Sequence, residues 1–295
     1  MNFAINTHIS IAQKLDDYKQ FVKLRLASLV VFSSGMGYLM AVDHITNWGQ
    51  LVLLLLGGFL IVGSANGINQ IIEKDSDQLM LRTANRPIAT GRMQVNEGIL
   101  VSLIMGVMGV GIIAVYMNYL SAVLGFAALC SYAFIYTPLK KKHPIAVLVG
   151  AFPGALPTLI GYTAAAGTIN YEAMLLFTIQ FIWQFPHFWA IAWRLHEDYQ
   201  RAGIRLLPES GEPGKKTAMQ TLIYTSTLIP VGLLISIMGY TGWISGVISL
   251  ICALYFTYTA WLLYQNCDRD TARRLMFGSY IYLPVVQLAW AFDRL

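Results

Sequence analysis

The sequence predicts an all-α, polytopic membrane protein: one domain, residues 1–295, folded as a bundle of nine transmembrane helices. Two observations predict this fold class. First, 56% of the 295 residues are hydrophobic, only 12% are charged, and the mean hydropathy is +0.57, whereas soluble domains average about 45–50% apolar and 25% charged residues. Second, the apolar residues form continuous runs rather than the short alternating segments of a membrane β-barrel. A soluble globule and a barrel are both disfavoured.

Nine apolar runs follow one another along the chain. Most of them approach the ~20 residues that a helix needs to cross the hydrocarbon core. The runs cover about residues 24–42, 49–71, 96–116, 119–137, 144–166, 172–194, 218–239, 242–265 and 275–292. Long polar loops follow the second and the sixth run, which suggests one helix followed by two four-helix halves of similar layout.

Residues 1–23 are predicted to form a cytoplasmic arm before the first span. They carry five charged residues and lack a separate apolar core with a cleavage site, so they do not resemble a signal peptide. Larger side chains recur at helical spacing at Ile11, Leu15, Tyr18 and Phe21. This pattern fits an amphipathic helix lying on the membrane surface, and it fits an ordinary helix leading into the first span equally well.

Basic residues fall almost entirely on one side of the predicted bundle. When the loops are assigned alternately to two sides, one side receives nineteen of the twenty Lys and Arg residues, and only Arg294 falls on the other. Because positively charged loops stay cytoplasmic, the N-terminus is predicted to lie inside and the C-terminus outside the cell inner (plasma) membrane. Both long loops are cytoplasmic in this arrangement, so we expect the functional residues on that side.

The first long loop opens with a row of acidic and amide side chains. Asn69, Glu73 and Asp77 are spaced i, i+4, i+8, so on a continuing helix they share one face over ~12 Å. Mg²⁺ is commonly held by one or two carboxylates together with substrate phosphates, and this row offers such ligands. Arg82 and Arg86 follow closely and are candidates for bidentate phosphate contacts. The alternative is a solvated helix end with ordinary loop charges.

The sixth apolar run ends with a second acidic pair, Glu197 and Asp198. A charge at the middle of the bilayer costs ~2.5–3.5 kcal/mol on insertion scales, so these carboxylates are expected at the interface or in a polar cavity. One or both would then face the first acidic row and hold a second Mg²⁺. On its own this pair is a weak indication of a metal site.

The fourth apolar run ends with an aromatic and a basic residue four positions apart, Tyr136 and Lys140. A lysine at this place either anchors the helix end at the cytoplasmic surface or neutralises a phosphate as a point charge. Pro138 lies between the two residues and is expected to interrupt the helix. For Lys141 and Lys142 we favour the role of membrane anchors.

Taken together, these segments resemble the intramembrane aromatic prenyltransferases, and among them the protohaem IX farnesyltransferase (haem O synthase) family. The resemblance spans nearly the whole chain. Its most specific elements are Asn69-x3-Glu73-x3-Asp77 with Met80, Arg82-Thr83-x2-Arg86-Pro87, Tyr136-Thr137 with Lys140, Trp183-Gln184-Phe185-Pro186-His187-Phe188-Trp189, and Asp198-Tyr199-x2-Ala202-Gly203 with Leu207-Pro208. The chain departs from the family pattern at Lys23-Leu24-Arg25, where Lys-Pro-Arg is usual, and at Glu73, where many relatives carry aspartate.

The resemblance implies a Mg²⁺-dependent transfer of a farnesyl group from farnesyl diphosphate to a vinyl group of haem B, giving haem O. It implies catalytic roles for Asn69, Glu73, Asp77, Asp198, Tyr136 and Lys140, with metal ligands among Asn69, Glu73, Asp77, Glu197 and Asp198. Arg82 and Arg86 would bind diphosphate. His187 would approach the haem iron or a propionate, or it pairs with a neighbouring helix. The expected partners are the lipid bilayer and a haem A synthase or terminal oxidase assembly, and no nucleic acid.

Three other functions stay open from the sequence. The nearest is prenyl transfer to another aromatic acceptor, such as a quinone precursor or a chlorin. A secondary transporter is the second, because acidic residues in membrane helices also mark ion pathways. Transport favours charged groups near the middle of the bilayer and broken helices, whereas the acids here cluster at one interface. The third is a structural subunit of an oxidase complex.

Overall fold

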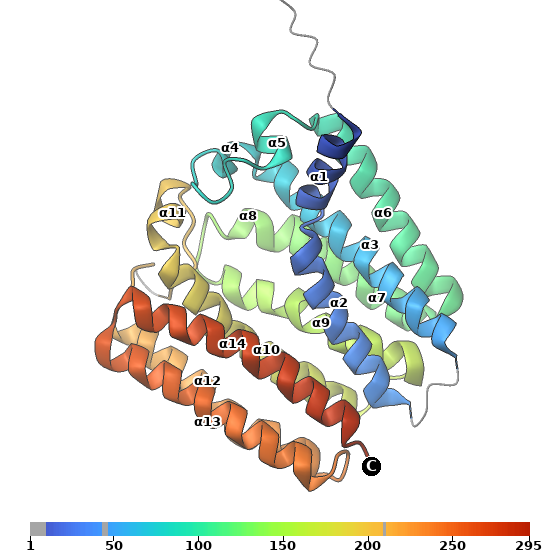
Figure 1. Cartoon of the computed structure of the whole chain (residues 1–295), viewed down its shortest axis with the longest axis vertical. Coiled ribbons are helices and arrows are strands. Elements are labelled where there is room, and N and C mark those ends of the chain that lie inside the picture. Colours follow the sequence, from blue (N-terminus) through green and yellow to red (C-terminus); the bar gives the residue numbers. More distant parts are fainter. Residues whose placement is uncertain (1–9, 43–46, 209–210) are drawn as a thin grey trace, which may run out of the picture.

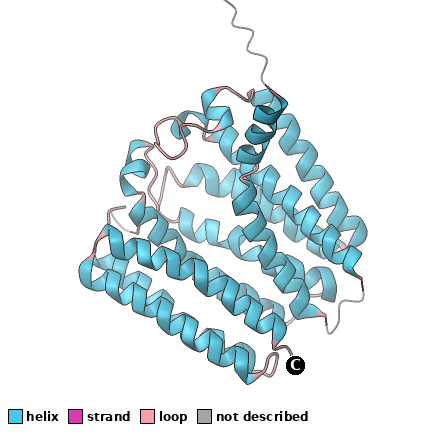
Figure 2. Ribbon diagram, in the orientation of Figure 1, coloured by secondary structure: helices cyan, strands magenta, loops and turns pink. Residues whose placement is uncertain are grey.

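The computed structural model describes residues 10–42, 47–208 and 211–295. These residues form helices joined by loops, and no β-strand occurs among them apart from one isolated bridge between Thr241 and Arg294. Figure 2 shows these helices and the loops that join them. The predicted all-α fold class is confirmed.

Within the described part of the chain, nine helical spans are long and apolar enough to cross a membrane, as predicted. The fourth span consists of α7 (Tyr119–Cys130), the π-helix η1 (Ser131–Tyr136) and α8 (Thr137–Leu139). The other spans are α2 (Leu24–Ala41), α3 (Trp48–Ile72), α6 (Val95–Tyr116), α9 (Ala146–Ala166), α10 (Tyr171–Arg194), α12 (Lys215–Ile237), α13 (Trp243–Asn266) and α14 (Arg269–Phe292).

The ninth span shows why hydropathy alone misplaces helix ends. α14 begins six residues before its predicted start at residue 275. Asp268 caps this helix, because its carboxylate accepts a hydrogen bond from the Thr271 amide at 2.7 Å. The charged first turns of α14 therefore belong to the helix although they do not belong to the apolar run.

Four short helices gather at one end of the bundle: α1 (Ile11–Phe21), α4 (Lys74–Asp77), α5 (Pro87–Thr90) and α11 (His196–Arg201). Figure 1 shows them away from the C-terminus, which lies at the opposite end of the molecule. We call the end that carries these four helices the polar end. The first span starts there and the last span finishes at the other end, as an odd number of spans requires.

α1 is held against the polar end by the protein itself. The Lys14 ammonium and the Tyr18 hydroxyl both donate hydrogen bonds to the Glu97 carboxylate, at 2.8 and 2.7 Å, and Phe21 is fully buried. The helix then leads directly into the first span, which agrees with one of the two sequence interpretations. Residues 1–9 of the predicted arm lie outside the described residues.

α9 is the central helix of the bundle, since it packs against α2, α7 and α10 and most of its length is buried. Its closest neighbour is α2, and glycines make this approach possible. A Cβ atom at Gly37 would overlap the backbone carbonyl of Thr158, and a Cβ atom at Gly161 would overlap that of Ser34. Small residues at a crossing let membrane helices pack closely, so these two positions fix the α2–α9 contact.

A buried polar network joins α2, α9, α10 and α14 inside the bundle. Gln287 Nε2 donates to Gln180 Oε1 at 2.9 Å and to Thr158 Oγ1 at 3.2 Å. Ser33 Oγ donates to Gln287 Oε1 at 3.1 Å. Because lipid offers no hydrogen bonds to compensate a buried polar group, these contacts hold the four helices in one register.

Candidate active site

The row of Asn69, Glu73 and Asp77 lies at the polar end, where α3 passes into α4. Although the helix is interrupted at Glu73, the i to i−4 hydrogen bonds continue, from the Glu73 amide to the Asn69 carbonyl at 3.0 Å and from the Asp77 amide to the Glu73 carbonyl at 2.8 Å. The three side chains therefore share one face. Each is at most 1% exposed, so this is a buried polar row rather than the solvated helix end of the alternative interpretation.

These side chains form one wall of a cavity that holds about 560 Å³ of empty space, including its opening to solvent. The cavity is lined by residues of α2 and the position before it, α3, α4 and the loop that follows, η1, the position after α8, and α11 with the segment after it. The lining comprises Lys23, Leu26, Asn69, Glu73, Asp77, Met80, Arg82, Arg86, Tyr132, Tyr136, Lys140, Tyr199, Ile204 and Leu206. Seven of the predicted site residues therefore meet in one hollow.

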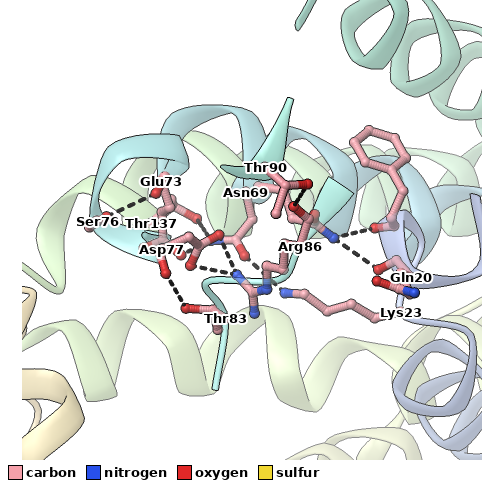
Figure 3. A network of polar contacts seen from close by, with 12 residues as sticks. Gln20, Lys23, Asn69, Glu73, Ser76, Asp77, Thr83, Arg86, Thr90 and Thr137 are labelled. Atoms are coloured by element: carbon pink, nitrogen blue, oxygen red, sulfur yellow. Dashed lines mark hydrogen bonds and ion pairs between the residues drawn. The ribbon is translucent and has the colours of Figure 1, made fainter. Parts of the chain in front are cut away.

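Both carboxylates in this cavity are paired with cations. Glu73 forms an ion pair with Lys140 at 2.5 Å, and Arg86 Nη1 bridges both oxygens of Asp77, at 2.8 and 2.7 Å. The Asn69 amide donates to the second Glu73 oxygen at 2.9 Å. Figure 3 shows the acidic row with Arg86 reaching it from the loop that follows α4. Each cavity carboxylate is therefore neutralised by a cation of the same cavity.

Lys23 is a cavity residue that the sequence interpretation assigned only to the N-terminal arm. Its ammonium donates to Asn69 Oδ1 at 2.9 Å. Burial, together with the nearby charges of Arg86 and Lys140, holds its pKa well below the usual 10.5. Its backbone has φ +53°, which is rare for a residue other than glycine. The sequence signal was its place in the Lys23-Leu24-Arg25 motif, directly before the first span.

Four cations and two carboxylates line the cavity. Lys23 and Arg82 complete the set formed by the two ion pairs. Burial also lowers the pKa of Lys140, although the neighbouring Glu73 carboxylate opposes that effect. The excess of positive charge suits an anion that carries several negative charges, because the electrostatic attraction is stronger in a site that is largely removed from water.

The π-helix η1 places two aromatic side chains in the cavity wall. It contains Tyr132 and Tyr136, whose ring centroids are 5.4 Å apart. The Thr137 hydroxyl donates to the Tyr132 carbonyl at 2.8 Å, which satisfies an acceptor in this irregular turn. Lys140 still bonds to Tyr136 through its amide, at 3.1 Å, so the proline between them does not separate the pair as expected. Single π-turns are frequent at functional sites.

Asp198 is close to the site but does not line the cavity. Its carboxylate accepts hydrogen bonds from the amides of Leu81 and Arg82, at 3.2 and 3.4 Å, and it pairs with Arg201. Burial alone would raise its pKa, but the hydrogen bonds from Arg201 and from the two amides outweigh that effect and lower it. Asp198 therefore fastens the loop after α4 to α11.

The second acidic pair does not line the cavity. Glu197 is exposed on α11, and Asp198 is occupied by the contacts just described. No cluster of three or more His, Cys, Asp or Glu side chains is placed to hold a metal ion in the part of the chain that the structure describes. Consecutive residues of a helix turn point in different directions, so only the fold determines which of the two carboxylates faces the first acidic row, and a second Mg²⁺ site here stays a prediction.

His187 lies on α10 and is not among the cavity residues. It stacks on Trp183, with ring centroids 4.4 Å apart, and its Nδ1 is 2.8 Å from the Ser279 hydroxyl of α14. Of the two sequence interpretations, the contact with a neighbouring helix is therefore observed.

Comparison with known proteins places this geometry in a family. Residues 30–281 match the UbiA prenyltransferase family. The chain belongs to the UbiA prenyltransferase family. This UbiA family member is 47% identical to the Protoheme IX farnesyltransferase of Cytophaga hutchinsonii, in an alignment covering 97% of the chain and 100% of the relative. It is 42% identical to the protein of the same name from Flavobacterium johnsoniae, with 100% and 99% coverage.

Solved structures share the fold of this UbiA family member. A structure described as digeranylgeranylglyceryl phosphate synthase superposes with a TM-score of 0.80 at 19% identity, covering 95% of this chain and 98% of the other. A UbiA homolog from Archaeoglobus fulgidus bound to GPP and Mg²⁺ superposes with a TM-score of 0.68 at 13% identity, covering 92% and 99%. At these identities the likeness establishes the helical arrangement of a multi-pass membrane protein.

The residues of this UbiA family member fit a divalent metal that is bound together with a phosphate. Glu73 and Asp77 supply hard oxygen donors on one cavity wall. Mg²⁺ usually takes only one or two carboxylates and completes its coordination with substrate phosphates and water. Two carboxylates beside four cations therefore match a metal diphosphate better than a metal ion alone.

Proposed function

We propose that this chain transfers the farnesyl group of farnesyl diphosphate to a vinyl group of haem B, giving haem O and diphosphate. The observation that carries this proposal is the cavity at the polar end, which is lined by two carboxylates and four cations. The chain that holds this cavity is 47% identical to a Protoheme IX farnesyltransferase. The cavity supplies the chemistry of diphosphate departure. The likeness to these relatives supplies the identity of the acceptor and of the prenyl donor.

On binding of the diphosphate, the cations and the carboxylates of the two ion pairs would each take a new partner. Lys140 and Arg86 would turn from Glu73 and Asp77 to the phosphate oxygens, and Arg offers a bidentate contact there. The freed carboxylates would then hold Mg²⁺, which neutralises the charge that develops on the leaving diphosphate. Lys23 and Arg82 would complete the binding of the anion. Each buried charge keeps a partner throughout this exchange, so no unpaired ion is created.

Departure of the diphosphate leaves an allylic cation on the farnesyl group. The rings of Tyr132, Tyr136 and Tyr199 line the cavity, and aromatic faces attract cations. They also exclude water that would hydrolyse the cation before transfer. Attack by the haem vinyl carbons forms the new carbon–carbon bond and moves the positive charge to the porphyrin side chain. Water then adds there and releases a proton, which leaves a hydroxyethylfarnesyl group.

The polar end would face the cytoplasm. It carries the cavity, and the alternating loop assignment puts nineteen of the twenty basic residues on this side, which the positive-inside rule assigns to the cytoplasm. The N-terminus would then be inside and the C-terminus outside the inner (plasma) membrane. Soluble farnesyl diphosphate would reach the cavity from the cytoplasm, and haem, whose macrocycle is apolar, would reach it through the bilayer.

Reconstitution tests the proposed function. The full chain, purified in detergent or in liposomes, is incubated with farnesyl diphosphate, haem B and Mg²⁺, and haem O and diphosphate are quantified. We expect both products in equal amounts, and none after chelation of the divalent metal. Diphosphate release only with a quinone precursor or a chlorin would identify another acceptor. Substrate-dependent uptake by liposomes without diphosphate release would replace the enzyme with a transporter.

A further inference from the structure

The backbone is strained where α1 passes into α2. We call residues 20–23 the α1–α2 corner. Lys23, its last residue, has φ +53° and ψ +58°, a left-handed conformation that is unfavourable for a residue with a Cβ atom. Such strain persists only where the surrounding structure holds it, and it clusters at functional sites. Here it belongs to the residue whose ammonium reaches Asn69 in the cavity (Figure 3).

Two amide side chains of α3 hold the α1–α2 corner by its backbone. Gln70 Nε2 donates to the carbonyls of Gln20 and Phe21, both at 2.9 Å. Asn66 Nδ2 donates to the Val22 carbonyl at 3.0 Å. Both amide side chains are buried, with at most 2% of their surface exposed. Three successive carbonyls, directly before the left-handed residue, are therefore fixed by one helix.

The surface of α3 that meets the corner follows one helix face. Its residues are spaced i, i+3, i+4, i+7: Gly63, Asn66, Gly67 and Gln70. A Cβ atom at Gly67 would lie 2.5 Å from the Phe21 ring, so the glycine lets α1 come close enough for the amides to reach its carbonyls. The same helix carries Asn69 of the cavity row. The position of the corner relative to that row is thus determined within one helix.

The amide oxygen of Gln70 contributes nothing to the stability of the fold. Gln70 is fully buried, and its Oε1 has no hydrogen-bond partner among the described residues. A buried acceptor without a partner lowers stability, and a methionine of similar length would fill the space without this cost. The two hydrogen bonds from Nε2 to the corner are therefore what the glutamine provides and an apolar residue could not.

We propose that Gln70 and Asn66 are positioning residues for Lys23: they hold the carbonyls of the α1–α2 corner and thereby aim the ammonium at the diphosphate. This inference rests on the proposed function and adds how one of its four cations is placed. Neither amide side chain lines the cavity, so each acts through Lys23. Without them the corner would relax from its left-handed conformation, and the ammonium would leave Asn69.

A double-mutant cycle on the purified full chain tests this coupling. The measured quantity is the affinity for inorganic diphosphate with Mg²⁺, obtained by calorimetry. Lys23→Met should weaken binding about 10- to 100-fold, because a hydrogen bond from a charged group is lost. Gln70→Met should weaken it about tenfold in the wild type, but by no more than about twofold when Lys23→Met is already present. Independent sites would show the same factor in both backgrounds.

The matched control is another buried hydrogen bond of α3. Ser64 Oγ donates to the Ser102 carbonyl at 2.7 Å, away from the corner. Ser64→Ala should lower the melting temperature and leave the diphosphate affinity unchanged, which separates general loosening of α3 from loss of the corner contacts. If Gln70→Met does not fold, Asn66→Ala gives the same cycle through the Val22 carbonyl.

The outcomes distinguish this proposal from the proposed function. Unchanged diphosphate affinity in Gln70→Met overturns the positioning role, even if the wild type makes haem O. An equal loss of affinity with and without Lys23 overturns it as well, because the effect would then not pass through the ammonium. If the coupling is found but the wild type makes no haem O, the positioning role stands and the proposed function fails.

Discussion

Replacing Lys140 with methionine removes the cation that pairs with Glu73. The Nζ to Oε1 distance is 2.5 Å, and the side chains are only 12% and 2% exposed. Removal of one partner from a buried pair typically costs about 3–5 kcal/mol, because the other charge is left without compensation. We therefore expect Lys140→Met to be strongly destabilised, and the double variant Lys140→Met/Glu73→Gln to regain most of that stability.

Activity should behave differently from stability in this series. Both the single and the double variant lack a cation that stabilises the departing diphosphate, so both should lose about 100- to 1,000-fold in the rate of diphosphate release. The neighbouring Lys141 is exposed, and Lys141→Met is the matched control. We expect it to retain wild-type stability and activity.

The assay combines thermal unfolding in detergent with the rate of diphosphate release. Equal effects of Lys140→Met and Lys141→Met would show that general surface charge matters rather than the Glu73 pair. A double variant that remained as unstable as Lys140→Met would refute the reasoning that an uncompensated Glu73 carboxylate causes the loss.

Three further predictions follow from the geometry. Asp198→Ala should release the loop after α4 and raise the KM for farnesyl diphosphate about tenfold or more, because each hydrogen bond to a charged group contributes about 1.5–3 kcal/mol. The control Glu197→Gln should leave the KM unchanged. Equal KM values for the two variants would refute the fastening role of Asp198. Lys23 loses its charge as the pH rises through the lowered pKa of its ammonium group. Calorimetry should therefore show weaker binding of inorganic diphosphate with Mg²⁺ at alkaline pH. The variant Lys23→Arg, which stays charged, should keep its affinity over the same pH range. Gly161→Val should lower the melting temperature sharply, since the added side chain meets the Ser34 carbonyl; an unchanged melting temperature would contradict the close α2–α9 contact.

The sequence contained enough information to predict the spans and the first acidic row. Hydropathy identifies segments long enough for the bilayer, and the i, i+4, i+8 spacing puts Asn69, Glu73 and Asp77 on one face because the i to i−4 hydrogen bonds continue through Glu73. Both inferences depend only on local geometry. For this reason they survive without knowledge of how the helices pack.

The remaining site features depend on tertiary structure. The direction of Asp198 is decided by the loop amides that it meets, and the reach of Lys23 into the cavity depends on a left-handed backbone at that residue. His187 contacts Ser279, which is 92 residues away along the chain. None of these contacts has a local sequence pattern, so a single sequence could not have revealed them.

The π-helix η1 (Ser131–Tyr136) makes the cavity sensitive to the number of residues as well as to their identity. It accommodates one residue more than an α-helical path of the same length, and each residue turns the helix by about 100°. Deletion of a single residue there would move Tyr136 out of its present position in the cavity wall without altering any other amino acid. Length variation of one residue in this turn is thus a route by which related chains could acquire a differently shaped wall for a different acceptor.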